Sequence, residues 1–131
     1  MDMRWPWWTV WVGRLVSCAP VAMVLISARW KLTHDSWYVQ EFARIGWAAS
    51  TLELLATLQL TAIALFVFPR TAVLGAVLLT GYLGGAIASY VRIGEFYPPL
   101  VPLTTALLAW LGIFLREERL RSLLPFRMTA R

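Results

Sequence analysis

The sequence WAASTLELLATLQLTAIALFVFPRTAVLGAVLLTGYLGGAIASYV, residues 47–91, decides the fold. It contains two apolar runs, at residues 47–68 and 71–91, which are separated only by the pair Pro69-Arg70. Each run has about the 20 residues that a helix needs to cross the hydrocarbon core of a bilayer. Because proline cannot continue a helix and the connection is very short, we predict an antiparallel hairpin of two transmembrane helices.

Two further apolar runs flank this hairpin, at residues 7–28 and about 98–115. The chain has 131 residues, of which 60% are hydrophobic, and a mean hydropathy of +0.65. This is more apolar surface than a soluble domain of that size can bury. We therefore predict an all-α membrane protein, in which residues 1–131 form a single transmembrane domain built as a four-transmembrane-helix bundle.

The long connection between the first and second spans, residues 29–46, predicts one more helix. Ser36 can cap its start, and Gly46 is suited to end it. Between them, Tyr38, Phe42 and Ile45 fall on one helical face. An amphipathic helix next to a span is typical of the membrane interface, so we expect a short interfacial helix there.

The distribution of Lys and Arg predicts the orientation of the spans. With four crossings, the amino terminus, the 69–70 turn and a basic tail of residues 116–131 share one face. That face holds seven cationic residues: Arg4, Arg70, Arg116, Arg119, Arg121, Arg127 and Arg131. The opposite face holds four: Arg29, Lys31, Arg44 and Arg92. Because positive residues favour the cytoplasm, both termini are predicted to be cytoplasmic.

Arg14 and Glu53 are ionisable residues inside predicted spans, where an unpaired charge is costly. Ser50 and Thr57 lie on the same side of the helix as Glu53, so this polar stripe is expected to face the interior of the bundle. Lys31, at the outer end of the first span, is at a depth similar to that of Glu53. We expect a cation or a hydrogen-bond donor beside Glu53, supplied by Lys31 or Arg14.

This polar cluster has two interpretations. In the first, Glu53 with Lys31 or Arg14 is the polar end of a pocket that binds a lipid head group or relays a proton. In the second, the cluster is an internal ion pair that fixes helix register and binds nothing. Tyr82 and Tyr90 have a similar ambiguity, because tyrosines near helix ends are typical of interfacial belts but can also hydrogen-bond a quinone or sterol.

Small residues recur along the third span. Gly81, Gly85 and Ser89 follow one another at four-residue spacing, and Gly84 begins a second row beside them. Such rows let another helix approach closely, so we predict helix packing here, within the bundle or against another subunit. Gln59 in the second span is expected to hydrogen-bond a neighbouring helix.

Several classes of function lack sequence support. His34 with Asp35 supplies too few ligands for a structural metal, and the single Cys18 can form neither an intrachain disulfide nor a CxxC pair. There is no Ser/His/Asp set, glycine-rich phosphate loop or pair of intramembrane histidines for haem. We therefore predict no metal and no cofactor. The net charge of +5 is better explained by a membrane surface than by nucleic acid.

Short motifs in a fixed order make the chain resemble the DoxX-like family of small four-helix membrane proteins over about residues 31–126. The motifs are Lys31, Phe42-Ala43-Arg44-Ile45-Gly46, Glu53-Leu54, Phe68-Pro69-Arg70, the stretch LLTGYLGGAIA at residues 78–88, Val91-Arg92, Leu115-Arg116 and Leu124-Pro125. Two features depart from the pattern: Tyr90 stands where many relatives have a histidine, and the region before Lys31 is rich in tryptophan. The resemblance implies the four-helix fold and a link to quinol-linked membrane oxidoreductases, in which relatives are accessory parts.

We therefore interpret the chain as a non-catalytic accessory subunit or assembly factor of a larger membrane complex, placed in the cytoplasmic membrane of a bacterium. Its expected partners are membrane lipids and either other subunits or a second copy. The alternative is a membrane-embedded enzyme or binder that acts on a lipid or quinone in a pocket near Glu53. A small transporter has less support, because four helices offer few polar positions for a pathway.

Overall fold

The computed structural model describes residues 6–123, with the side chains of residues 121–123 left aside. Within this part of the chain the fold is entirely helical, as predicted. In chain order, the elements are α1 (Trp7–Leu32), α2 (Ser36–Arg44), the 3-10 helix η1 (Ala49–Thr51), α3 (Leu52–Val67), α4 (Ala72–Arg92), α5 (Leu100–Arg116) and α6 (Glu118–Leu123).

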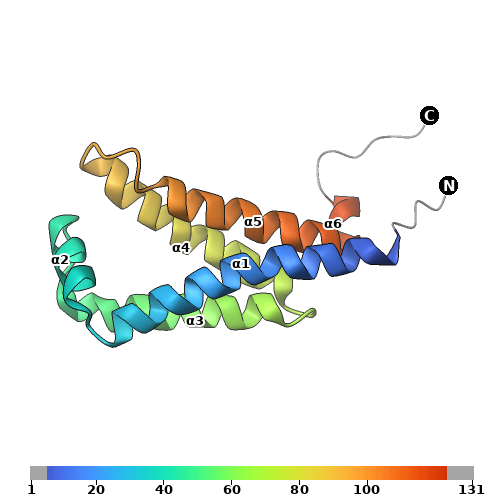
Figure 1. Cartoon of the computed structure of the whole chain (residues 1–131), viewed down its shortest axis with the longest axis horizontal. Helices are drawn as coiled ribbons and strands as arrows, with labels where there is room; N and C mark the ends of the chain where they lie inside the picture. The colour runs from blue at the N-terminus through green and yellow to red at the C-terminus, as the bar shows by residue number, and fades with distance from the viewer. Residues whose placement is uncertain (1–5, 124–131) are drawn as a thin grey trace.

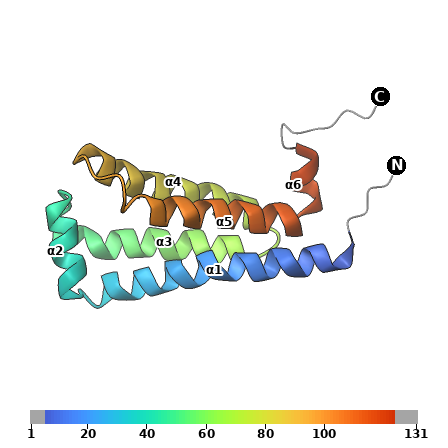
Figure 2. The ribbon, with the colours of Figure 1, turned by 45° about the horizontal axis from the view of Figure 1, so that its top comes forward.

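The helices α1, α3, α4 and α5 run alongside one another as a bundle (Figures 1 and 2). α1 packs against α3 and α5, and α4 packs against the same two helices, so the four form a ring. The start of α1, the α3–α4 turn and α6 lie at one end of this bundle, which we call the terminal end. α2 lies across the opposite end, which we call the α2 end.

Three helical segments are long and apolar enough to cross a membrane: Trp7–Leu32, Ala49–Val67 and Ala72–Arg92. The fourth predicted span is observed as a shorter apolar helix of 17 residues, Leu100–Arg116, because Pro98 and Pro99 precede its first turn. The outside of the bundle is covered by exposed apolar side chains such as those of Leu15 and Leu107. A surface of this kind suits contact with lipid.

Three glycines bring helices into close contact near the terminal end. A Cβ atom on Gly13 of α1 would lie 2.9 Å from the carbonyl oxygen of Gly112 in α5. A Cβ atom on Gly75 of α4 would clash with the backbone nitrogen and Cα of Phe66 in α3. Phe66 itself is fully buried at this end of the core. Small residues therefore set the spacing of α1 with α5 and of α3 with α4.

The glycine row predicted to pack against a helix has a different environment. In the described part of the chain, and apart from α4's own backbone and each glycine's sequence neighbours, no atom lies within 4 Å of a Cβ placed on Gly81, Gly84 or Gly85. Of the two predicted alternatives, these three glycines therefore do not show packing within the bundle, because α4 meets its neighbours through other positions, including Leu79. Ser89 is buried, and packing of the row against another subunit stays a prediction.

Arg116 belongs to the bundle rather than to a free tail. It ends α5, and its Nη2 donates to the backbone oxygen of Phe66 at 2.7 Å. α6 follows directly, and its Leu120 is buried against the core. The predicted basic tail of residues 116–131 is thus helical up to residue 123 except at the extended Glu117, and the remainder lies outside the described residues.

Candidate functional site

The short helix α2 forms as predicted and lies over one end of the bundle. Its cap is Asp35, one residue before the predicted Ser36, and the Asp35 carboxylate accepts a hydrogen bond from the Trp37 backbone at 3.0 Å. After the helix, Gly46 has a φ of +94°, a left-handed conformation that favours glycine and lets the chain turn back toward α3.

Polar side chains fasten α2 to the end of α4. The Tyr90 hydroxyl donates to Glu41 at 2.9 Å. Arg44 pairs with Glu41 at 2.5 Å, and its guanidinium also bonds the carboxylate of Glu95 in the α4–α5 loop. The hydrogen bonds from Arg44 and then from Tyr90 hold the pKa of Glu41 below its usual value, against the opposing effect of desolvation. We call these four residues the α2 latch.

Two more bonds join the segment after α2 to α4. The Trp47 indole donates to the hydroxyl of the buried Ser89 at 3.1 Å, and the Arg92 guanidinium donates to the backbone oxygen of Ile45 at 2.5 Å. Ile45 is buried, so the apolar face of α2 that was expected to meet the membrane instead meets the protein at this residue.

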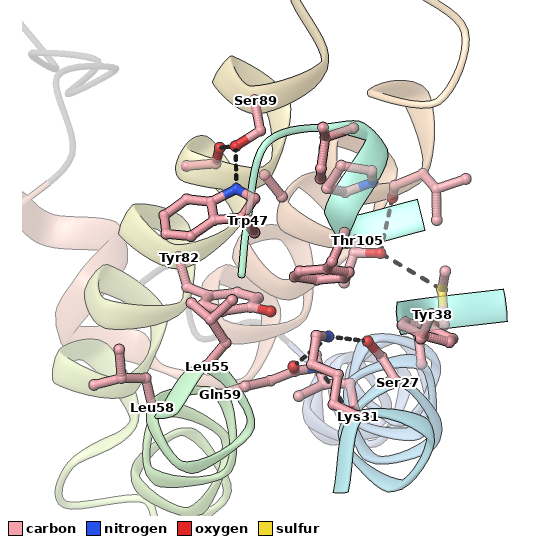
Figure 3. A pocket seen from close by; sticks show the side chains of 18 of the residues that line it. Ser27, Lys31, Tyr38, Trp47, Leu55, Leu58, Gln59, Tyr82, Ser89 and Thr105 are labelled. Atoms are coloured by element: carbon pink, nitrogen blue, oxygen red, sulfur yellow. Dashed lines mark hydrogen bonds between the residues drawn. The ribbon is translucent and has the colours of Figure 1, made fainter. Parts of the chain in front are cut away.

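A cavity of about 880 Å³ lies at the α2 end, with a lining drawn from α1 to α5 (Figure 3). Small-molecule sites in proteins are typically roughly 300 to 1,000 Å³ and mostly apolar, so this cavity has the size and character of a ligand site. Its lining is mainly apolar and includes Val24, Leu55, Leu58, Val77, Leu78, Val101 and Pro102.

Lys31 forms the polar end of the cavity. Only 3% of its surface is exposed, and its Nζ donates to Ser27 Oγ at 2.6 Å and to Gln59 Oε1 at 2.9 Å (Figure 3). The Gln59 amide in turn donates to the backbone oxygen of Val24 at 2.8 Å. The prediction that Gln59 bonds a neighbouring helix is therefore confirmed, and the contact ties α3 to α1 beside the ammonium.

Three aromatic rings surround the same ammonium. Lys31 Nζ lies 5.4 Å from the ring centroid of Tyr38, 5.6 Å from that of Phe42 and 5.7 Å from that of Tyr82. These distances are within the range of cation–π attraction. Among residues 6–120, no carboxylate lies within ion-pair distance of Lys31. Neutral oxygens and ring faces therefore solvate its charge.

Glu53 does not belong to this cavity. Its side chain is 72% exposed, and its Oε1 lies 3.3 Å from Nε2 of His34 in the loop before α2. The expected hydrogen-bonding neighbour is present, but it is His34 rather than Lys31 or Arg14. The prediction that Glu53 faces the bundle interior is wrong, and the cavity described above is lined by Lys31 and not by Glu53.

The side of α3 that faces inward explains this difference. Leu52, Ala56 and Gln59 are buried, whereas Ser50 and Thr57 are exposed with Glu53. The Thr57 hydroxyl donates to the backbone oxygen of Glu53, which satisfies it within the helix. The polar stripe predicted to face the protein therefore lies on the outer side of α3.

Arg14 is far from the cavity. It precedes Lys31 by 17 residues on the same helix, a separation of about 25 Å at the rise of an α-helix. Its side chain is exposed, and the guanidinium lies 4.9 Å from the ring centroid of Trp11. Of the predicted cluster, the described structure places Lys31 alone in the cavity lining.

Several residues that line the cavity were not predicted from the sequence to belong to the polar site. Ser27 was not predicted to contact Lys31, although it lies one helical turn before that residue, and this i, i+4 spacing is a usable signal for a side-chain contact. Tyr38 and Phe42 were assigned to the membrane interface, but both approach the ammonium. For Tyr82 the sequence left two roles open, a belt residue and a hydrogen-bonding partner of a quinone or sterol, and the residue lines the cavity.

The chain matches the DoxX-like family over residues 15–112. It belongs to the DoxX-like family. The matched region begins before Lys31 and ends before the Leu115-Arg116 motif. The motifs noted in the sequence of this DoxX-like protein cover about residues 31–126 instead. Family membership and the apolar helices together show that this DoxX-like protein is an integral membrane protein. No curated protein and no solved structure matches it. The lining residues named for the cavity all lie within the matched region.

Proposed function

We propose that this DoxX-like protein binds an amphipathic molecule from the membrane, with an oxygen-bearing polar group at Lys31 and an apolar part in the cavity. The observation that carries this proposal is a buried ammonium at one end of an apolar cavity. A charged side chain within a membrane is costly and marks a functional site by default. The alternative foreseen from the sequence is thus moved from Glu53 to Lys31.

The hydrogen bonds of Lys31 leave room for a ligand. An ammonium has three donor protons, and two are directed to Ser27 and Gln59. The third is available to an acceptor in the cavity. Since the rest of the lining is mainly apolar, the site offers a charged anchor at Lys31 and a long apolar contact surface, which is the pattern of a site for an amphipathic molecule.

The cavity is also accessible to molecules in the bilayer. Met23 and Ile26 of α1, Leu58 of α3 and Val77 of α4 line it and are exposed on the outside of the bundle. An apolar chain can therefore pass between the lipid and the cavity without crossing water. This supports a ligand that is drawn from the membrane itself.

Copurification tests the proposal. The full chain is purified in mild detergent, and the bound small molecules are identified by native mass spectrometry. We expect the wild-type protein to retain a lipid-like molecule, Lys31→Met to lose it, and Arg14→Met to retain it as a matched control on the same helix. A wild-type protein that carries no such molecule and binds no added lipid or quinone would refute the function.

We also propose that the chain crosses the membrane four times, with α5 as the fourth span. Both termini then lie in the cytoplasm of a bacterium, and the cavity lies toward the opposite face of the membrane. The packing of α5 along α1 and α4 supports this arrangement, as does the position of α2 opposite the start of α1. Reporters fused at Met1 and Arg131 should both indicate the cytoplasm, while one inserted at Asp35 indicates the other side. A cytoplasmic signal at Asp35 would overturn this orientation.

A second candidate function is the accessory subunit expected from the sequence. It is favoured by the exposure of Trp7, Trp8 and Trp11 along the start of α1, and by the uncovered Gly84 of α4. Large exposed aromatic rings suit contact with another protein as well as an interfacial belt. Crosslinking from Trp8 replaced by a photoreactive residue distinguishes the two, because an accessory subunit gives a defined protein adduct and a belt residue gives lipid adducts.

A further inference from the structure

We infer that the group bound at Lys31 is the carboxylate of a single-chain amphiphile, a free fatty acid. This inference rests on the proposed binding function and names the chemical class of the ligand. Three features of the cavity support it: the charge that remains uncompensated, the hydrogen-bond donors that remain free, and the small space around the ammonium.

The uncompensated charge belongs to Lys31. Glu41 also lines the cavity, but its carboxylate is occupied by Arg44 and Tyr90. A buried charge without a partner is destabilising, and an anion that carries one negative charge would compensate it. A neutral quinone would accept a hydrogen bond from Lys31 but leave the positive charge unbalanced. The charge balance therefore favours a monoanion.

Two free donors face the same part of the cavity. One is the third proton of the Lys31 ammonium. The other is the hydroxyl of Tyr82, which forms no hydrogen bond with a residue of the described chain and is directed toward the side of the cavity where Lys31 lies (Figure 3). The two oxygens of a carboxylate can accept both bonds. This donor set is small for a phosphate monoester, which has three acceptor oxygens and a charge of about −1.5 to −2.

The space around the ammonium is confined. The rings of Tyr38, Phe42 and Tyr82 all lie between 5.4 and 5.7 Å from Nζ, and the α2 latch holds the first two in place. A compact polar group fits among these rings better than the larger head group of a phospholipid. The apolar chain of the ligand would extend away from Lys31 along Leu55 and other apolar lining residues.

A matched series of ligands tests the inference. Stearate with a brominated chain is bound to the full-length protein in detergent, and its quenching of fluorescence from Trp37 and Trp47, which line the cavity, is measured. Palmitate, hexadecanol, ubiquinone and dipalmitoyl phosphatidylglycerol are then used as competitors. We expect palmitate to compete at least about tenfold better than hexadecanol, since the two share a chain and differ in charge.

Variants test whether the preference for palmitate over hexadecanol depends on Lys31 and Tyr82. Lys31→Met should abolish the advantage of palmitate and leave hexadecanol within about twofold, whereas Lys31→Arg should keep most of the advantage because it keeps the charge. Tyr82→Phe removes one donor and should weaken palmitate about tenfold or less, without loss of the ammonium. It therefore provides a second test if Lys31→Met fails to fold. Glu53→Gln, outside the cavity, should change neither competitor.

Two kinds of result would overturn the inference. If hexadecanol or ubiquinone competes as well as palmitate, the ligand is neutral, and if phosphatidylglycerol competes better, it is a phospholipid. Both outcomes reject the fatty acid but leave the binding function intact. If brominated stearate and every competitor fail to bind, the binding function itself is rejected.

Discussion

The two ends of the bundle use glycine for opposite purposes. At the terminal end, Gly13, Gly75 and Gly112 lie where a neighbouring helix leaves no room for a side chain. At the α2 end, Gly81 and Gly85 border the cavity, and no described atom of another helix lies within 4 Å of a Cβ placed on either. The same residue type thus closes one end of the molecule and helps to keep the other hollow.

This comparison shows that a small residue permits close approach without causing it. A helix can pack against glycine only if its own side chains and its crossing angle bring it there. At the α2 end, the space beside α4 is bordered by α2 and Lys31 instead. A ridge of small residues in a membrane helix therefore marks either a tight interface or a hollow, and the two predict opposite responses to added side-chain volume.

The largest expected effect is at the terminal end. Gly75→Ala should destabilise the protein by roughly 1 to 3 kcal/mol or more, because the added Cβ meets the backbone of Phe66, which cannot move aside as a side chain can. Gly84→Ala is the matched control in the same helix. It should be neutral or stabilise by up to about 1 kcal/mol, since the space is open and alanine favours helix. Unfolding in detergent, followed by circular dichroism, measures both, and equal effects would contradict the contrast.

The next prediction concerns a substitution that adds side-chain volume to the cavity at the α2 end. Gly85→Leu should reduce binding of brominated stearate at least about tenfold, because the new side chain enters the cavity. The unfolding temperature should stay within about 2 °C of the wild type, since the space around the Cβ position is open and the rest of the side chain extends into the cavity. Gly84→Leu, one residue earlier and outside the lining, should bind normally. Loss of stability without loss of binding in Gly85→Leu would show that this end is packed rather than hollow.

The α2 latch should make the stability of the protein depend on pH through its contacts at the α2 end. Glu41 has a lowered pKa in the folded protein, so it adds stability above its usual value of 4.5 and loses that contribution as the pH falls through 4.5 toward the lower folded value. Glu41→Gln should therefore cost about 1 kcal/mol at pH 7, and the cost should shrink toward zero in acid. Paired unfolding curves of wild type and variant across this range measure it. A difference that grows as the pH falls would refute the role of the latch.

The smallest effect is expected at Glu53. Its contact with His34 is exposed, and exposed ion pairs contribute at most about 0.5 to 1 kcal/mol. Glu53→Gln should thus lie within that range and leave ligand binding unchanged. Thermal unfolding and the stearate assay together provide the check. A large loss of binding would restore Glu53 to the site that the sequence had suggested.

The sequence by itself determined the elements that depend on local properties. Apolar length predicted four spans, and the structure shows three helices long enough to cross a membrane and a shorter apolar fourth helix. Pro69-Arg70 predicted the turn of the hairpin, and Gly46 predicted the end of α2. Lys31 was also identified as part of a polar site. These features need only the chain near them, because helix length, turn residues and the cost of charge in lipid are properties of short segments.

Only the tertiary structure decided which side of each helix faces inward. In a soluble helix, an apolar stripe marks the buried face, but a membrane helix is apolar on its lipid side as well. The sequence of α3 predicted the hydrogen bond of Gln59 to a neighbouring helix, but it could not show that Glu53 points away from the core. The partners of Lys31 come from three other elements, α2, α3 and α4, and they meet only when the ring of helices is assembled.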